Sequence, residues 1–143
     1  MAGFLDVEPL VRALDRSVER WHAAPIVHDE PAPPLLKASL IHGHNFELWH
    51  QEDEARAVGV DDAVIGRVKR RIDPLNQNRN DAIEALDELL LDELAARNVD
   101  AGADARLHSE TVGSIVDKLS ILTLKIYHMR EETLRKDAGE AHR

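Results

Sequence analysis

Apolar residues recur at helical spacing through most of the chain, and breaks between the repeats divide it into four segments. A repeat that starts at Leu10 and ends at Trp21 predicts a first helix over residues 7–22. Residues 23–34 hold four prolines, so this stretch cannot continue the helix and predicts an extended connection. No segment alternates between apolar and polar positions over a useful length, and strands are therefore not expected.

A second and a third helix are expected to form a hairpin. The second covers residues 35–58, where Gly59 supplies a stop, and Asp61 can cap the next helix only two residues later. So short a turn predicts that the two helices are antiparallel neighbours. The third helix covers residues 61–97 and should be kinked before Pro74.

A small and polar loop precedes a fourth helix, which is expected over residues 111–136. The apolar stripe that this helix should turn to the core is Ile115, Leu119, Leu122, Ile126 and Met129. The whole pattern predicts an all-α fold, an antiparallel four-helix bundle with one long kinked helix in a single domain, residues 1–143.

Some apolar residues exceed what one bundle can cover. Leu89, Leu90 and Leu91 point in three directions, and Ile121 and Leu124 leave the stripe of the fourth helix. A second chain would cover these residues in a homodimer. The alternative is a wider core that the proline-rich segment closes.

Composition narrows the class of protein. The 143 residues carry 18 Lys plus Arg against 27 Asp plus Glu, a net charge of −9, and there is no Cys. Disulfides, zinc ribbons and Cys nucleophiles are excluded, and a general nucleic-acid or anionic-membrane surface is not expected. The first residues carry charges where a signal peptide needs an apolar run, and no stretch is as long as a membrane span. These features predict a soluble, cytoplasmic protein.

Polar residues inside the apolar stripes are the informative feature of this sequence. Arg79 lies at the centre of the stripe of the third helix, with Asn76 and Asn80 beside it. Asn45 and Glu52 fall inside the stripe of the second helix. A buried guanidinium without an acceptor is strongly destabilising, so Arg79 must meet carboxylates, carbonyls or a bound anion.

The rise per residue indicates which polar groups share a level in the bundle. A hairpin that turns near Gly59 places Arg79 level with His42 and Asn45. The fourth helix is expected to return antiparallel, and the first to fold back through its linker, so that both add polar groups to this level. The predicted layer contains His42, Asn45, Asn76, Arg79, Asn80, Lys125 and His128, with Asp15 and Glu84 as nearby acids. Glu52 lies further along the axis and should belong to a second polar layer.

Two hypotheses of different classes account for this layer. In the first it is a small-molecule site, where Arg79 and Lys125 fix an anionic group such as a phosphate ester or a sugar nucleotide. The other residues of that site are Asn45, Trp49, Asn76 and Asn80 for binding, with His42, His128, Glu52 and Asp53 as catalytic candidates. In the second, a non-enzymatic helical dimer docks onto another protein, and the layer only fixes the helix register. An open cavity at Arg79 would favour the first hypothesis, and a closed network the second.

A metal site is not expected from the spacing of the histidines. His42 and His128 could form a ligand set with an acid, but no His-x-x-x-His or Glu-x-x-His spacing supports one. The pattern names no cofactor. The histidines that receive no role, because they lie at helix ends, in loops or off the main stripe, are His22, His28, His44, His50 and His142.

Three motifs in order resemble a known family. They run from His42 to Arg56 with a Leu-Trp and a Glu-Asp pair, from Lys69 to Glu84 with Asn-Gln-x-Arg-Asn-Asp, and from Ser109 to Met129 with Leu-Ser-Ile and Tyr-His-Met. Together they are similar to a bacterial family of uncharacterised helical proteins, domain of unknown function 4254. The resemblance implies a helical fold and carries no established activity. Some members lie beside genes of sugar transfer and cell-envelope polysaccharides, which implies a partner pathway and no chemistry.

Two weaker likenesses point to enzymes. Residues 83–97 resemble the first helix of helical chorismate mutases, although Asn80 stands where that family has an arginine. Glu84-x-x-Asp87 resembles half of the magnesium signature of the all-helical nucleotide pyrophosphatases, whose upstream acidic cluster has a different spacing. A metal-dependent hydrolase of that type is the minor alternative.

Overall fold

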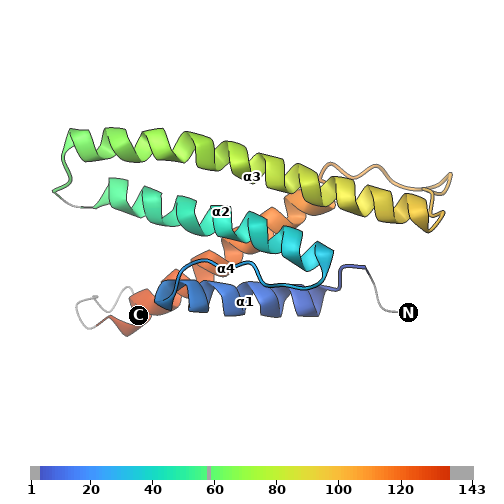
Figure 1. Ribbon diagram of the computed structural model, residues 1–143, viewed down its shortest axis with the longest axis horizontal. Helices are drawn as coiled ribbons and strands as arrows, with labels where there is room; N and C mark the ends of the chain where they lie inside the picture. The colour runs from blue at the N-terminus through green and yellow to red at the C-terminus, as the bar shows by residue number, and fades with distance from the viewer. Residues whose placement is uncertain (1–3, 58, 136–143) are drawn as a thin grey trace.

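The computed structural model describes residues 4–57 and 59–135, and these residues form four α-helices and no strand (Figure 1). The helices are α1 (Val7–Ala23), α2 (Pro33–Arg56), α3 (Asp62–Ala96) and α4 (Val112–Leu134). Each observed end lies within two residues of the expected end, and the all-helical prediction is confirmed. Within the described ranges, no helix is long and apolar enough to cross a membrane.

Local signals in the sequence set several helix ends. The Asp61 carboxylate caps α3 by accepting a backbone N–H at 2.9 Å, and the Thr111 hydroxyl caps α4 in the same way at 3.1 Å. Gly59 has a φ of 81°, the left-handed conformation that favours glycine just beyond a helix. α3 continues through Pro74, so the long third helix is present as expected.

α1 runs parallel to α2, whereas the sequence predicted that α1 folds back against it. Leu14 belongs to one core cluster with Ile41, and Trp21 belongs to the next cluster with Phe46, so residue numbers rise together along the two helices. The cause is the linker, which returns along α1 before α2 begins (Figure 1). Its nine residues, 24–32, reach about 30 Å when extended, which exceeds the ~26 Å length of α1.

Polar contacts hold this linker against the bundle. The Arg20 guanidinium donates to both carboxylate oxygens of Asp29 and to the Val27 carbonyl, each at 3.1 Å. His28 Nδ1 lies 2.7 Å from Ser39 Oγ of α2. The Arg20 contacts are exposed, so they fix the path of the linker more than they add to stability.

α4 runs antiparallel to α3 but begins well before the end of it. The Gly113 amide donates to Asp87 Oδ1 at 2.7 Å, although α3 continues to Ala96. The connecting segment therefore folds back along the last turns of α3 (Figure 1). As a result Arg79 lies beside Asp117, whereas equal helix lengths placed it near residue 129. The expected level of His128 and Lys125 was wrong for this reason.

Four of the five residues of α4 that were expected to be buried are exposed, and Leu119 alone of the five is half-buried against the core. Leu122 is 50% exposed and Met129 is 59% exposed. The residues that α4 buries instead are Gly113, Val116, Ser120, Thr123 and Leu124. Most of them are small or polar, so apolar spacing alone selected the wrong side of this helix.

The core consists of two neighbouring apolar clusters. The first contains Leu10, Leu14, Ala38, Ile41, Leu86 and Val116, and the second contains Val18, Trp21, Phe46 and Leu124. All four helices contribute to the first cluster, while α1, α2 and α4 form the second. Polar side chains lie beside both clusters and are described next.

The start of α4 offers a test of how closely it packs on α3. A Cβ on Gly113 would lie 2.7 Å from the Ile83 carbonyl oxygen, so Gly113→Ala should force the helices apart and cost about 2 kcal/mol or more. A Cβ on Gly66 would meet only the end of Arg70 at 3.5 Å, and Gly66→Ala should stabilise α3 by about 0.5–1 kcal/mol. Urea unfolding of both variants measures the difference. Equal stability of the two variants would contradict the close packing at Gly113.

Candidate functional site

A buried network of polar side chains joins α1, α2 and α4. His42 and Ser120 are 0% exposed and Asn45 is 3% exposed. His42 Nε2 lies 3.0 Å from the Leu14 carbonyl oxygen, and His42 Nδ1 lies 2.7 Å from Ser120 Oγ. The Asn45 amide donates to Ser120 Oγ at 3.0 Å and to Asp117 Oδ1 at 2.9 Å.

The positions of the hydrogens in this network follow from which atoms can donate and which can only accept. A carbonyl only accepts, so His42 Nε2 carries the proton that it donates to Leu14. His42 Nδ1 must then accept from the Ser120 hydroxyl, and the hydroxyl oxygen is left to accept from Asn45. His42 is therefore neutral, and each of these groups has a partner. Burial lowers the pKa of His42 to about 4, against a smaller opposing effect of the Leu14 carbonyl.

Arg79 approaches the edge of the network without completing it. Its Nε lies 3.9 Å from Asp117 Oδ1, which is an ion pair but not a hydrogen bond. The Nε atom is buried and has no hydrogen-bond partner, while the side chain as a whole is 28% exposed. Four cavities of about 290 to 390 Å³ in the described part of the chain are lined by residues other than Arg79. By the criterion set from the sequence, this geometry is closer to a closed network than to an open site.

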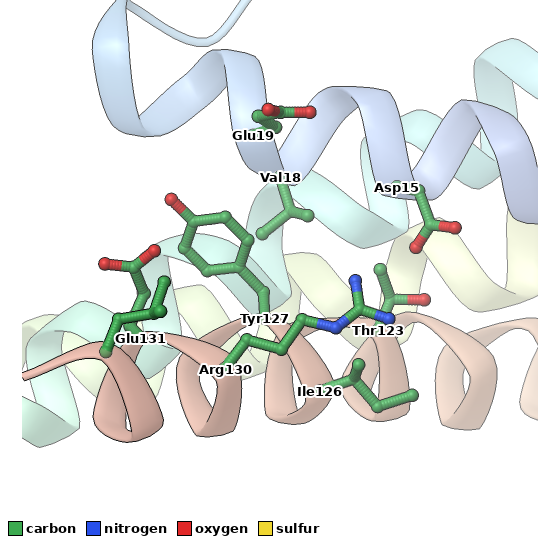
Figure 2. Close-up of a pocket in the computed structure, with 9 residues that line it drawn as sticks. Asp15, Val18, Glu19, Thr123, Ile126, Tyr127, Arg130 and Glu131 are labelled. Carbon is green, nitrogen blue, oxygen red and sulfur yellow. The ribbon is translucent and has the colours of Figure 1, made fainter.

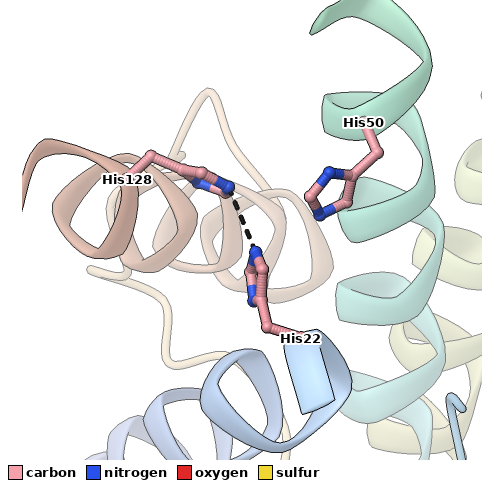
Figure 3. Close-up of side chains that lie close together, drawn as sticks. All are labelled: His22, His50 and His128. Atoms are coloured by element: carbon pink, nitrogen blue, oxygen red, sulfur yellow. Dashed lines mark hydrogen bonds between the residues drawn. The ribbon is translucent and has the colours of Figure 1, made fainter. Parts of the chain in front are cut away.

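A group of three histidines lies two turns further along α4. There His128 meets His22 of α1 and His50 of α2 (Figure 3). One ring nitrogen from each histidine can be chosen so that all three lie within 4.8 Å of one another. His22 Nε2 and His128 Nε2 are 3.3 Å apart.

Aromatic rings enclose this histidine cluster, which consists of His22, His50 and His128. Trp49 stacks on His128 with ring centroids 4.6 Å apart, and Tyr127 stacks on His22 at 4.3 Å. Burial lowers the pKa of His50, and the charge that His22 and His128 can carry lowers it further. His22 is exposed and His50 and His128 are half-buried, so the cluster lies at the edge of the bundle with two of its rings stacked on aromatic neighbours.

A cavity of about 290 Å³ lies beside this cluster, between α1 and α4 (Figure 2). Tyr127 lines it, and its charged residues are Asp15, Glu19, Arg130 and Glu131. Three carboxylates face one guanidinium there, so the cavity does not favour an anion. Burial raises the pKa of Tyr127, and the negative charges of Glu131 and Glu19 raise it further.

The family model of proteins of unknown function named DUF4254 matches residues 37–143. The chain belongs to this family. The match confirms the resemblance seen in the three motifs and spans most of α2 and all of α3 and α4. No curated protein and no solved structure matches the chain. Of the histidine cluster, His50 and His128 lie inside the matched region, whereas His22 precedes it.

The structure of this DUF4254 protein divides the predicted polar layer. His42, Asn45 and Arg79 lie together as expected, and Asp117 and Ser120 join them. Asn76 is half-buried on α3. Trp49 stacks on His128, and Lys125 lies on the outward side of α4. The remaining candidates are exposed and are Asp15, Glu52, Asp53, Asn80 and Glu84. Glu52 pairs with Arg56 on the surface at 3.5 Å, so the expected second polar layer does not form around it.

Sequence reasoning missed two members of the histidine cluster. His22 received no role because it lies at a helix end, and His50 because it lies off the main apolar stripe, and the expected direction of α1 kept the two apart. His142, also set aside, lies outside the described residues. The signal that could have found the cluster is a constant offset between parallel helices: Leu14 meets His42, and eight residues further His22 meets His50.

The pKa of His42 makes stability depend on pH in a defined window. Its folded pKa of about 4 lies below the ordinary value of 6.5, so the unfolded chain binds more protons between these values. The contribution of His42 is complete above pH 6.5 and falls as the pH drops toward 4, by roughly 3 kcal/mol. His42→Gln should remove this part of the pH dependence in urea unfolding at pH 7 and pH 4.

The matched control for that measurement is His108→Gln, in an exposed loop. It should keep the pH dependence of the unsubstituted chain. An unchanged pH dependence in His42→Gln would contradict the buried, neutral state assigned to His42.

Proposed function

We propose that this DUF4254 protein is a helical association module that pairs with a second copy of itself through the outward face of α4. The observation that carries this proposal is the outward apolar stripe of that helix. Its members follow one another at intervals of three and four residues: Val112, Ile115, Leu122, Ile126 and Met129 are exposed, and Leu119 between them is half-buried against the core. This spacing is typical of a helix that packs along another helix.

The amount of exposed apolar surface supports a partner. Along the stripe, Leu122, Ile126 and Met129 are 50%, 44% and 59% exposed. At one end Val112 also lines an apolar cavity of about 390 Å³ with Leu90 and Leu94 of α3. A stable interface buries about 800 Å² of each partner and has an apolar centre, which this stripe would supply.

A second copy is the favoured partner because it presents the same stripe at the same length. The pairing then closes on itself as a two-fold dimer. The dimer predicted from the sequence rests on a partly different set of residues. Of that set, Leu91 and Ile121 are exposed, Leu89 and Leu90 are half-buried, and Leu124 is buried in the core of one chain at 1% exposure.

The buried network has a supporting role in this proposal. Unpaired buried donors and acceptors cost about 1–3 kcal/mol each, so the network penalises any other rotation of α4. The observed rotation of α4 turns Ser120 toward the core and Leu122 toward the outside. The register function of the polar layer and the association function of the apolar stripe therefore depend on the same rotation of α4.

The association proposal predicts the mass of the particle in solution. Light scattering at micromolar concentration should give close to twice the 16.0 kDa chain mass. Leu122→Glu combined with Met129→Glu should give the mass of one chain with an unchanged helical circular dichroism spectrum, because charge on the stripe opposes pairing. Leu107→Glu, at a fully exposed loop position, is the control and should stay dimeric. A single-chain mass for the unsubstituted protein would refute the proposal.

A second candidate function is the binding of a small anion, such as a phosphate ester or sugar nucleotide, at Arg79. The observation that favours it is the buried Arg79 Nε without a hydrogen-bond partner. Inorganic phosphate should then raise the melting temperature of the unsubstituted chain, and Arg79→Met should remove that rise. Arg71→Met, an exposed position of the same helix, is the control. No response to phosphate in the unsubstituted chain would leave Arg79 as a member of the register network alone.

A further inference from the structure

The histidine cluster carries chemistry that the proposed association does not use. His22, His50 and His128 come from three different helices and point their rings toward one another (Figure 3). We propose that they form a binding site for one divalent transition-metal ion of the zinc type.

Hydrogen bonds to the backbone settle which nitrogens of two rings are free. His22 Nδ1 lies 2.6 Å from the Val18 carbonyl oxygen, and His128 Nδ1 lies 2.7 Å from the Leu124 carbonyl oxygen. Because a carbonyl only accepts, both Nδ1 atoms carry hydrogen. In a neutral ring the lone pair is then on Nε2. A backbone carbonyl on the remote nitrogen is also the usual outer partner of a metal-bound histidine.

The two Nε2 atoms stand at a separation that suits a shared metal. They are 3.3 Å apart, and two nitrogens bound to one tetrahedral zinc at ~2.0–2.1 Å are also about 3.3 Å apart. Without a cation between them, two neutral rings present lone pairs to each other. One proton could join these two nitrogens, so this pair alone does not decide the occupant.

The third ring distinguishes a metal from a proton. His50 Nε2 is buried and has no hydrogen-bond partner. A proton would satisfy two nitrogens and leave His50 unpaired, whereas a metal ion satisfies all three. The ligand atoms lie within 4.8 Å of one another, so a small rotation of the His50 ring completes the set.

The donor set selects the kind of metal. Three imidazole nitrogens without a thiolate favour zinc, copper, nickel or cobalt over magnesium, calcium or manganese. Stacking by Trp49 on His128 and by Tyr127 on His22 holds two rings in place before a metal arrives. Three protein ligands leave a fourth position for water or another small ligand, as in zinc sites that bind exchangeable ligands.

The first test is a calorimetric titration of the full chain with zinc chloride, after treatment with a chelator and dialysis. One zinc ion should bind per chain and should raise the melting temperature. His50→Ala and His128→Ala should each weaken binding by about 100-fold or more. His44→Ala, on the same helix as His50 but outside the cluster, should change the affinity by less than about twofold.

A second measurement needs no variant and so does not depend on how well a variant folds. In nitrogen NMR spectra of the unsubstituted chain, zinc should shift the Nε2 resonances of three histidines and leave their Nδ1 atoms unmetallated. The absence of binding, unchanged affinity in His50→Ala, or shifts at histidines outside the cluster would each overturn the proposal. One zinc per two chains would also overturn it, because the site would then lie between copies.

Discussion

The Asn45 amide and its two acceptors set the arrangement of this protein. The NH₂ group of Asn45 on α2 donates to Ser120 and to Asp117 on α4, and the Ser120 hydroxyl in turn donates to His42. His42 extends the connection to the backbone of α1 at Leu14. A rotation or a slide of α4 would leave several of these buried groups unpaired, at about 1–3 kcal/mol for each. Apolar packing is less directional and would tolerate such a shift more easily.

Two features of the molecule follow from that one register. The first is the outward apolar stripe of α4. The small and polar side of this helix faces the core, where it joins the network, so the apolar side faces outward. The second is the histidine cluster. α1, α2 and α4 run in the same direction, so three residues that lie together at one level are followed, two turns later, by three others that also lie together. The matched residues are Leu14, His42 and Ser120 at the network, and eight residues later His22, His50 and His128.

The sequence predicted the elements well and their arrangement in part. Helix ends followed from caps such as Asp61 and Thr111, and the placement of Arg79 near His42 and Asn45 followed from the tight α2–α3 turn. The direction of α1 depended on a linker long enough to return along it, and the level of α4 depended on a loop that folds back. Composition and periodicity predict neither the path of the linker nor the path of the loop. His22 and His50 were missed because a cluster drawn from three helices has no local spacing to reveal it.

The central claim is that the network, rather than apolar spacing, decides which side of α4 faces the core. Because the chain has no cysteine, single substitutions can report on this directly through the rate of thiol labelling. Leu122→Cys and Leu124→Cys, compared at concentrations low enough to keep chains apart, place the probe on opposite sides of the helix. The account predicts that position 122 reacts nearly as fast as in the unfolded chain, while position 124 is strongly protected. Faster labelling at position 124 than at position 122 would contradict it.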